Sequence, residues 1–146
     1  MANKIIIPNA DFSSNAAYKE GGVTPITTTL VNGFASRQNN TTVNVDSSSS
    51  AMSIRVRTGE LYGAFHVKVK SGYLIRSIIY YDTSIDYSTS GSKTSSGVTE
   101  AVGSTQNLTE YTLSVTNKYA CITFCKTNAS TNISPTEDIV DELYYI

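Results

Sequence analysis

Histidine is the residue on which a Ser-His-Asp or Cys-His catalytic set would depend, and the chain has a single one, His66. It stands between Phe65 and Val67, in a run whose next polar positions are lysines. Successive side chains of a strand point to opposite faces, so this pattern predicts an exposed histidine in mid-strand and not a general base. No serine lies in a Gly-x-Ser-x-Gly segment, the pattern of a hydrolase nucleophile. We therefore expect no nucleophilic catalysis.

A pair of carboxylates is the other common catalytic set of hydrolases, and the 12 acidic residues suggest no such pair. Glycoside hydrolysis needs two carboxyl groups that face one cleft, roughly 5 to 10 Å apart. Most of the acids fall in expected turns, and the adjacent Asp141 and Glu142 would project to opposite faces of a strand. Glycine loops that cradle phosphate are missing as well. These patterns predict a protein that is not an enzyme.

The two cysteines, Cys121 and Cys125, lie four residues apart in an apolar run. Four residues of a strand span roughly 13 Å, whereas a disulfide needs Cα atoms within about 7 Å. We therefore predict that they do not pair with each other and are small buried hydrophobes in a reducing compartment. No cluster of metal ligands accompanies them.

Tyrosine is the abundant aromatic residue, with 10 Tyr, 4 Phe and no Trp. It offers flat apolar area with a polar tip, which suits a protein interface or the face of a sugar ring. We expect most tyrosines to be half-buried and the surplus as a group to mark one contact surface. The residues predicted to contact a ligand or partner are Tyr62, Tyr80, Tyr81 and Tyr87. Of these, Tyr87 is expected to be exposed.

Short alternating runs between turn-forming clusters must position these side chains. Strands are predicted over residues 4–7, 23–31, 41–45, 51–58, 64–70, 73–82, 98–102, 111–116, 119–126 and 139–146. In the run 51–58, Met52, Ile54 and Val56 are expected on the inner side of a half-buried strand and Ser53, Arg55 and Arg57 on the outer side. Asn32-Gly33 predicts a tight turn, and residues 83–97 predict a long loop.

The composition agrees with β structure, because Thr, Tyr, Val and Ile suit a pleated, half-buried surface. The length of 146 residues fits one domain. We predict a single all-β domain over residues 1–146, a β-sandwich or jelly roll of about 8–10 antiparallel strands with both ends of the chain tied into sheets.

Net charge and hydropathy limit the classes of partner that we expect for this chain. A net charge of -1 provides no basic field for phosphates, so nucleic-acid binding is disfavoured. The opening residues contain too few apolar positions for a signal-peptide core, and no 18-residue apolar run follows. We expect a chain made in the cytoplasm that does not insert into membranes.

Two terminal segments resemble galactose-binding-like jelly rolls, including many carbohydrate-binding modules. The segment Ile7–Ser13 is similar to their "N-G-D-F-E/S" start, and Ile139–Tyr144 to their closing "I-D-D-V-x-L" strand. The resemblance implies first and last strands side by side. It also draws attention to Asp11 and Asp141 as oxygen ligands for a structural Ca²⁺, although capping of turns or pairing with Lys or Arg is the favoured interpretation. No cofactor is predicted, and the chain lacks the tryptophan that those modules present to sugars.

A second set of segments resembles β-sandwich modules in virion proteins of tailed bacteriophages. These segments are 72–82, 119–128 and 133–137. The resemblance implies a non-catalytic virion surface protein, made in the host cytoplasm, that decorates the capsid or belongs to a tail appendage. Its expected partners are other virion proteins, further copies of itself and host polysaccharide. The alternative is a stand-alone carbohydrate-binding module.

Overall fold

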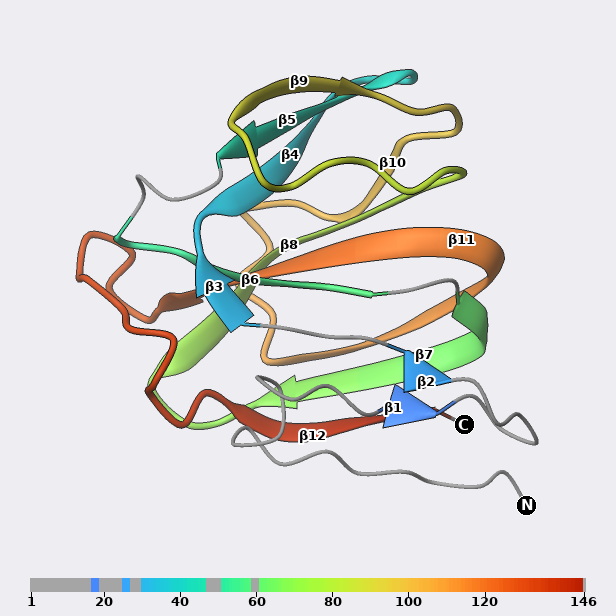
Figure 1. The fold of residues 1–146 in the computed structure, drawn as a ribbon. Helices are drawn as coiled ribbons and strands as arrows, with labels where there is room; N and C mark the ends of the chain where they lie inside the picture. Colours follow the sequence, from blue (N-terminus) through green and yellow to red (C-terminus); the bar gives the residue numbers. More distant parts are fainter. Residues whose placement is uncertain (1–16, 19–24, 27–29, 47–50, 59–60, 146) are drawn as a thin grey trace.

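The computed structural model describes residues 17–18, 25–26, 30–46, 51–58 and 61–145, and these contain strands but no helix (Figure 1). The strands are β1 (Ala17–Tyr18), β2 (Pro25–Ile26), β3 (Leu30–Asn32), β4 (Phe34–Asn39), β5 (Thr42–Asp46), β6 (Ile54–Arg57), β7 (Leu61–Val69), β8 (Tyr73–Tyr81), β9 (Gly91–Thr94), β10 (Thr99–Val102), β11 (Glu110–Lys126) and β12 (Val140–Tyr145). The prediction of an all-β sandwich is confirmed. The described part also offers no helix of the length and apolar character that a membrane span requires.

The longest strand, β11, connects two layers. Its first half pairs with β7, from Glu110 opposite Lys68 to Lys118 opposite Leu61. Its second half lies between β8 and β6. The register shifts between Thr116 and Lys118, and Asn117 there adopts a left-handed φ of 57°. We predicted two separate strands, 111–116 and 119–126; one bent strand occupies both ranges.

The central sheet has the order β10-β8-β11-β6-β3 and is covered on both faces. On β8, the neighbours Ile78 and Ile79 are 1% and 0% exposed although their side chains point to opposite sides. Five consecutive residues of β11, Cys121–Cys125, are likewise buried. A strand buried on both faces reads as a continuous apolar run, which is why 73–82 was predicted to be a central strand.

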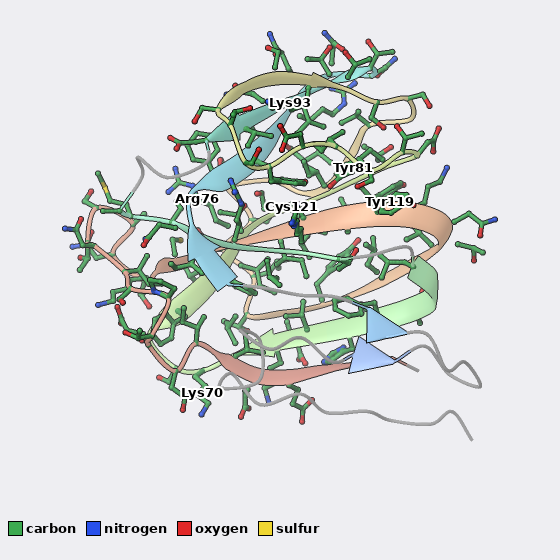
Figure 2. The ribbon with its side chains drawn as sticks, in the orientation of Figure 1. Lys70, Arg76, Tyr81, Lys93, Tyr119 and Cys121 are labelled. Atoms are coloured by element: carbon green, nitrogen blue, oxygen red, sulfur yellow. The ribbon has the colours of Figure 1, made fainter. Side chains whose placement is uncertain are left out.

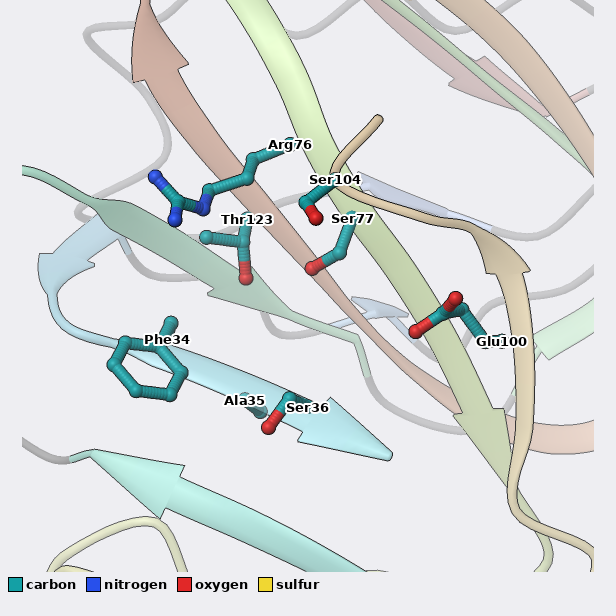
Figure 3. Close-up of a pocket in the computed structure, with 8 residues that line it drawn as sticks. All are labelled: Phe34, Ala35, Ser36, Arg76, Ser77, Glu100, Ser104 and Thr123. Atoms are coloured by element: carbon teal, nitrogen blue, oxygen red, sulfur yellow. The ribbon is translucent and has the colours of Figure 1, made fainter. Parts of the chain in front are cut away.

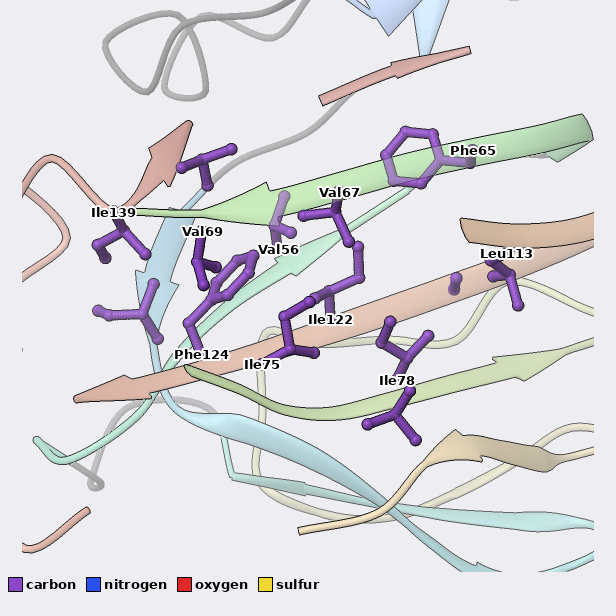
Figure 4. Packing of buried hydrophobic residues seen from close by; sticks show 14 of the residues in the cluster. Val56, Phe65, Val67, Val69, Ile75, Ile78, Leu113, Ile122, Phe124 and Ile139 are labelled. Carbon is purple, nitrogen blue, oxygen red and sulfur yellow. The ribbon is translucent and has the colours of Figure 1, made fainter. Parts of the chain in front are cut away.

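One face of the central sheet packs against a lower layer formed by β12, β7 and the first half of β11 (Figures 1 and 4). Phe65, Val67 and Val69 of β7 point inward, as their alternation predicted. They meet a row from β6, β8 and β11 that comprises Ile54, Val56, Ile75, Ile78, Ile122 and Phe124. Each such fully buried side chain contributes roughly 1.5–3 kcal/mol by removal from water.

The other face carries a second, smaller core under the outer sheet β4-β5-β9. Ala35, Val43 and Val45 of that sheet pack against Ile79 and Cys121 of the central sheet. Figure 2 shows Cys121 and Tyr81 on the side of the central sheet that faces the outer sheet. The chain thus builds two cores, one on each face of β8 and β11.

Three local predictions are corrected by this arrangement. Asn32-Gly33 is not a hairpin turn: β3 pairs with β6 and β4 with β5, so the chain passes there from one sheet to another. Residues 83–97 are not all loop, since Gly91–Thr94 forms β9 against β5. Arg55 does not point to solvent; it is 4% exposed, because the outer sheet covers that face of β6.

Of the two predicted terminal strands, the structure describes one. The predicted first strand, 4–7, lies outside the described residues. The predicted last strand is present as β12, which pairs with β7.

Candidate functional site

Two of the predicted contact residues, Tyr81 and Tyr87, lie in the core beneath the outer sheet, 1% and 4% exposed. Their hydroxyl groups are hydrogen-bonded to each other, and the Tyr81 ring stacks on Tyr119 at 6.4 Å between centroids. The prediction that Tyr87 is exposed is therefore wrong. The physical reason is that its Ser- and Thr-rich segment folds back over the central sheet instead of extending into solvent.

Two arginines enclose the Tyr87 ring. The guanidinium carbons of Arg55 and Arg57 lie 4.9 and 5.4 Å from its centroid. Arg55 also donates to the backbone oxygens of Asp46, at 2.5 Å, and Tyr87, at 3.0 Å. Burial raises the pKa of the Tyr87 hydroxyl well above its ordinary value and that of the Cys121 thiol to about 11. Both groups stay neutral at physiological pH, and Arg55 joins β6 to the end of β5 and to Tyr87 through its hydrogen bonds.

The other tyrosines whose side chains the structure describes do not gather on one surface. Tyr80 is half-buried and packs against the core between the central sheet and the lower layer (the lower core), as do Tyr73 and Tyr111. Tyr119 packs against the smaller core under the outer sheet (the upper core). For Tyr62, in β7, the structure describes the backbone only. The described tyrosines are thus divided between the two cores.

His66 is more enclosed than predicted. It lies on the outer face of β7, but its side chain is 12% exposed. Its Nδ1 lies 2.7 Å from Thr112 Oγ1, and its Nε2 lies 3.6 Å from a Glu110 oxygen and 3.8 Å from a Glu142 oxygen. This is a cross-strand polar cluster of β7, β11 and β12.

Of the two carboxylates considered as Ca²⁺ ligands, the structure describes Asp141 alone. Asp11 lies outside the described residues. Asp141 is exposed and pairs with Lys68, with 3.9 Å between Oδ2 and Nζ. Within the described ranges no group of three or more His, Cys, Asp and Glu side chains is arranged to hold a metal. Cys121 and Cys125 are free and buried, as predicted.

A cleft opens between the outer sheet and the central sheet (Figure 3). It has a volume of about 200 Å³. We call it the Arg76–Glu100 cleft; its lining residues are Phe34, Ala35 and Ser36 of β4, Arg76 and Ser77 of β8, Glu100 of β10, Ser104, and Thr123 of β11.

Two irregularities in strand pairing shape this cleft. On β8, Ser77 pairs with Thr123 and Ile75 with Phe124, so Arg76 is an extra residue without a partner on β11. An extra residue of this kind re-aims a side chain and breaks the alternation of faces. Both Arg76 and Ser77 therefore line the cleft, although they are consecutive. On β10 the register shifts between Glu100 and Val102 in the same way.

The charges of the cleft stand apart from each other. Figure 3 shows the Arg76 guanidinium at one end and the Glu100 carboxylate at the other, with Ser77 and Ser104 between them. Neither forms an ion pair within the part of the chain that the structure describes. Arg76 interacts with the Cys125 thiol, whose pKa is raised by burial and lowered in part by that cation. A thiol is a weak acceptor, so it leaves most of the guanidinium's donors available.

The floor of the cleft holds a polar group that the protein does not satisfy. Thr123 is fully buried, and its hydroxyl oxygen has no hydrogen-bond partner among the described residues. The hydroxyl lies close enough to the Cys121 thiol to lower the pKa of that thiol in part. A thiol is only a weak hydrogen-bonding group, so it does not satisfy the hydroxyl well. A buried hydroxyl without a good partner costs about 1–3 kcal/mol.

A second hollow of about 180 Å³ adjoins the first, because Arg76 and Ser104 line both. It extends toward Asn107, Cys125 and Thr127. Sequence reasoning missed this site entirely. Arg76 and Glu100 are 24 positions apart in the sequence, and neither stands in a pattern typical of a binding or catalytic site. The pairing of β8 with β10 brings them to one cleft.

Comparisons with known proteins leave the family open. No family model matches the chain, and no curated protein sequence matches it. Among solved structures, the chain is similar to a secreted serine protease VesC from Vibrio cholerae, at 14% sequence identity and a TM-score of 0.31. The similarity covers 98% of this chain and 29% of that chain, so this chain spans less than a third of the protease's length. A likeness this distant carries no argument about activity.

Proposed function

We propose that this chain is a non-catalytic surface component of a tailed-phage virion, in the capsid decoration or a tail appendage, that contacts other virion subunits and host glycans. The proposal begins from the resemblance of segments 72–82, 119–128 and 133–137 to virion β-sandwich modules. These segments comprise β8, the second half of β11 and the approach to β12.

The observation that carries the proposal is how little apolar surface the described residues leave outside. Met52, at 44%, is the exposed large hydrophobic residue of that part. Among the described residues, most large apolar side chains lie in the two cores, and the surface carries hydroxyls, amides, charged groups and the edges of the strands β9 and β10. Contacts with neighbours then run through polar groups and strand edges, which subunit assembly can cover.

Mass spectrometry of purified particles tests this proposal. Particles from the source would be banded by density, washed with salt and digested, and peptides of this chain would be quantified against the major capsid protein. We expect a constant ratio across preparations, with an abundant cytoplasmic host protein as the control for carry-over. Absence of the chain from washed particles contradicts the proposal.

The second candidate is a stand-alone carbohydrate-binding module, and the Arg76–Glu100 cleft is the observation that favours it. The cleft presents a half-buried aromatic ring, two separated charges and several hydroxyls. A glycan array with the isolated chain distinguishes the two candidates when read together with the particle experiment. Saturable glycan binding by a chain that is missing from particles supports the module.

A further inference from the structure

We infer that the Arg76–Glu100 cleft binds a carboxylated sugar, such as a uronic or sialic acid residue of a glycan. This inference rests on the glycan contact in the proposed function, to which it gives a site and a ligand class. Its basis is the chemistry of the lining residues.

Arg76 selects the anionic group. A guanidinium presents a planar fork of donors that matches a carboxylate. No carboxylate of the described residues pairs with Arg76, and the cleft's own acid, Glu100, stands at the opposite end (Figure 3). A ligand carboxylate is therefore drawn to Arg76 and repelled by Glu100, which fixes its orientation.

The space between the two charges fits a polyhydroxylated ring. Ser77 and Ser104 offer hydroxyls that both donate and accept, and Glu100 accepts from hydroxyls. Phe34 supplies an apolar ring face at the wall made by β4. A free amino acid would satisfy the two charges but would leave the serines and the Phe34 ring without a partner.

The size of the cleft limits the ligand to one residue. Its volume of about 200 Å³ is below the roughly 300–1,000 Å³ of sites for drug-sized molecules. The adjoining hollow on the other side of Arg76 gives a glycan chain a direction in which to continue.

Two further observations indicate a built site. Arg76 is itself the extra residue in β8, and such bulges are concentrated next to functional sites. The buried Thr123 hydroxyl in the cleft lining has no partner among the described residues, so the protein's own groups leave polar capacity unused there.

The test is an NMR titration of the isotope-labelled full chain with methyl β-glucuronide and, separately, methyl β-glucoside. The two sugars differ in carrying a carboxylate or a neutral hydroxymethyl group. We expect the glucuronide to shift amide signals of β4, β8 and β10 and to bind about tenfold or more tightly than the glucoside.

Variants locate the effect. Arg76→Gln should remove the preference for the glucuronide, and Glu100→Gln should weaken the binding of both sugars. Lys68→Gln, which removes one positive charge from the far side of the molecule, should leave the preference unchanged. Unchanged amide spectra outside the cleft show that each variant is folded.

The inference is overturned if the two sugars bind alike, if shifts fall outside the cleft, or if glycine competes as well as the glucuronide does. If the titration fails but the chain is present in washed particles, the sugar ligand is wrong and the virion role stands. If the chain is absent from particles but binds the glucuronide, the virion role is wrong and the sugar ligand stands.

Discussion

At the scale of single residues, Thr123 is the polar group whose burial is least compensated in the described part of the chain. Replacing it by valine removes the hydroxyl at nearly constant shape. We expect Thr123→Val to raise the free energy of unfolding by about 1 kcal/mol, because an unsatisfied buried hydroxyl is lost. Urea denaturation measures the change.

A matched control exists in Thr58, which is also buried. Its Oγ1 accepts a hydrogen bond from the Ala120 backbone amide at 3.0 Å. Thr58→Val leaves that amide proton without this acceptor and should destabilise the chain by roughly 1–3 kcal/mol. Equal losses in the two variants would show that the Thr123 hydroxyl has a partner after all.

One buried thiol and two buried tyrosine hydroxyls have raised pKa values, so we expect the folded chain to lose stability at alkaline pH. Burial raises the pKa of the Cys121 thiol to about 11, and it raises those of Tyr81 and Tyr87 as well. The unfolded chain releases a thiol proton near roughly pH 8.5, whereas the folded chain holds it. The associated stability is therefore full below that pH and is lost as the pH rises toward about 11.

We expect the free energy of unfolding to fall by a few kcal/mol between about pH 8 and pH 11. The urea midpoint, followed by circular dichroism at each pH, measures it. Cys121→Ala should show a smaller fall than the parent chain. A midpoint that does not change over this range would contradict the buried, neutral thiol.

At the scale of elements, Gly33 is the point where the chain leaves the central sheet for the outer sheet. Its φ is +122°, and a Cβ there would stand 2.2 Å from the Asp46 backbone oxygen. Gly33→Ala combines backbone strain with a clash that backbone atoms cannot relieve. We expect it to lower stability by more than roughly 3 kcal/mol.

Gly91 separates the two contributions. It has a similar φ of +127°, but nothing lies within 4 Å of its Cβ position. Gly91→Ala should therefore cost only the backbone strain, about 1–3 kcal/mol. Thermal unfolding of the two variants gives the comparison, and similar losses would mean that the contact of Gly33 with β5 is not tight.

Elements were predictable from sequence where one face of a strand meets one core. The alternation of Phe65, Val67 and Val69 correctly placed the inner face of β7, and the apolar run in β8 indicated a central strand. Prediction failed where tertiary cover overrides local pattern. Arg55 reads as a surface residue, and Tyr87 lies in a Ser- and Thr-rich segment, yet the outer sheet encloses both.

The cleft was beyond sequence reasoning for a related reason. An extra residue in a strand leaves no signature in the sequence: Leu74-Ile75-Arg76-Ser77-Ile78 reads as an ordinary strand whether or not Arg76 pairs. The consequence, two consecutive side chains on one face, follows only from the register with β11.

At the scale of the whole molecule, the central sheet separates two cores. This arrangement holds β4 over β8 and β11, and so makes the Arg76–Glu100 cleft. It also explains why the tyrosines with described side chains are divided between the two cores instead of forming one surface. In a plain two-layer sandwich, β8 would present one face to solvent.

Paired alanine substitutions on β8 test this arrangement most directly. Ile78 belongs to the lower core and its neighbour Ile79 to the upper core, and they are 1% and 0% exposed. We expect Ile78→Ala and Ile79→Ala each to lower the free energy of unfolding, measured in urea, by roughly 2–5 kcal/mol. If one of the two variants proves nearly as stable as the parent chain, β8 is covered on a single face and the account of the cleft is wrong.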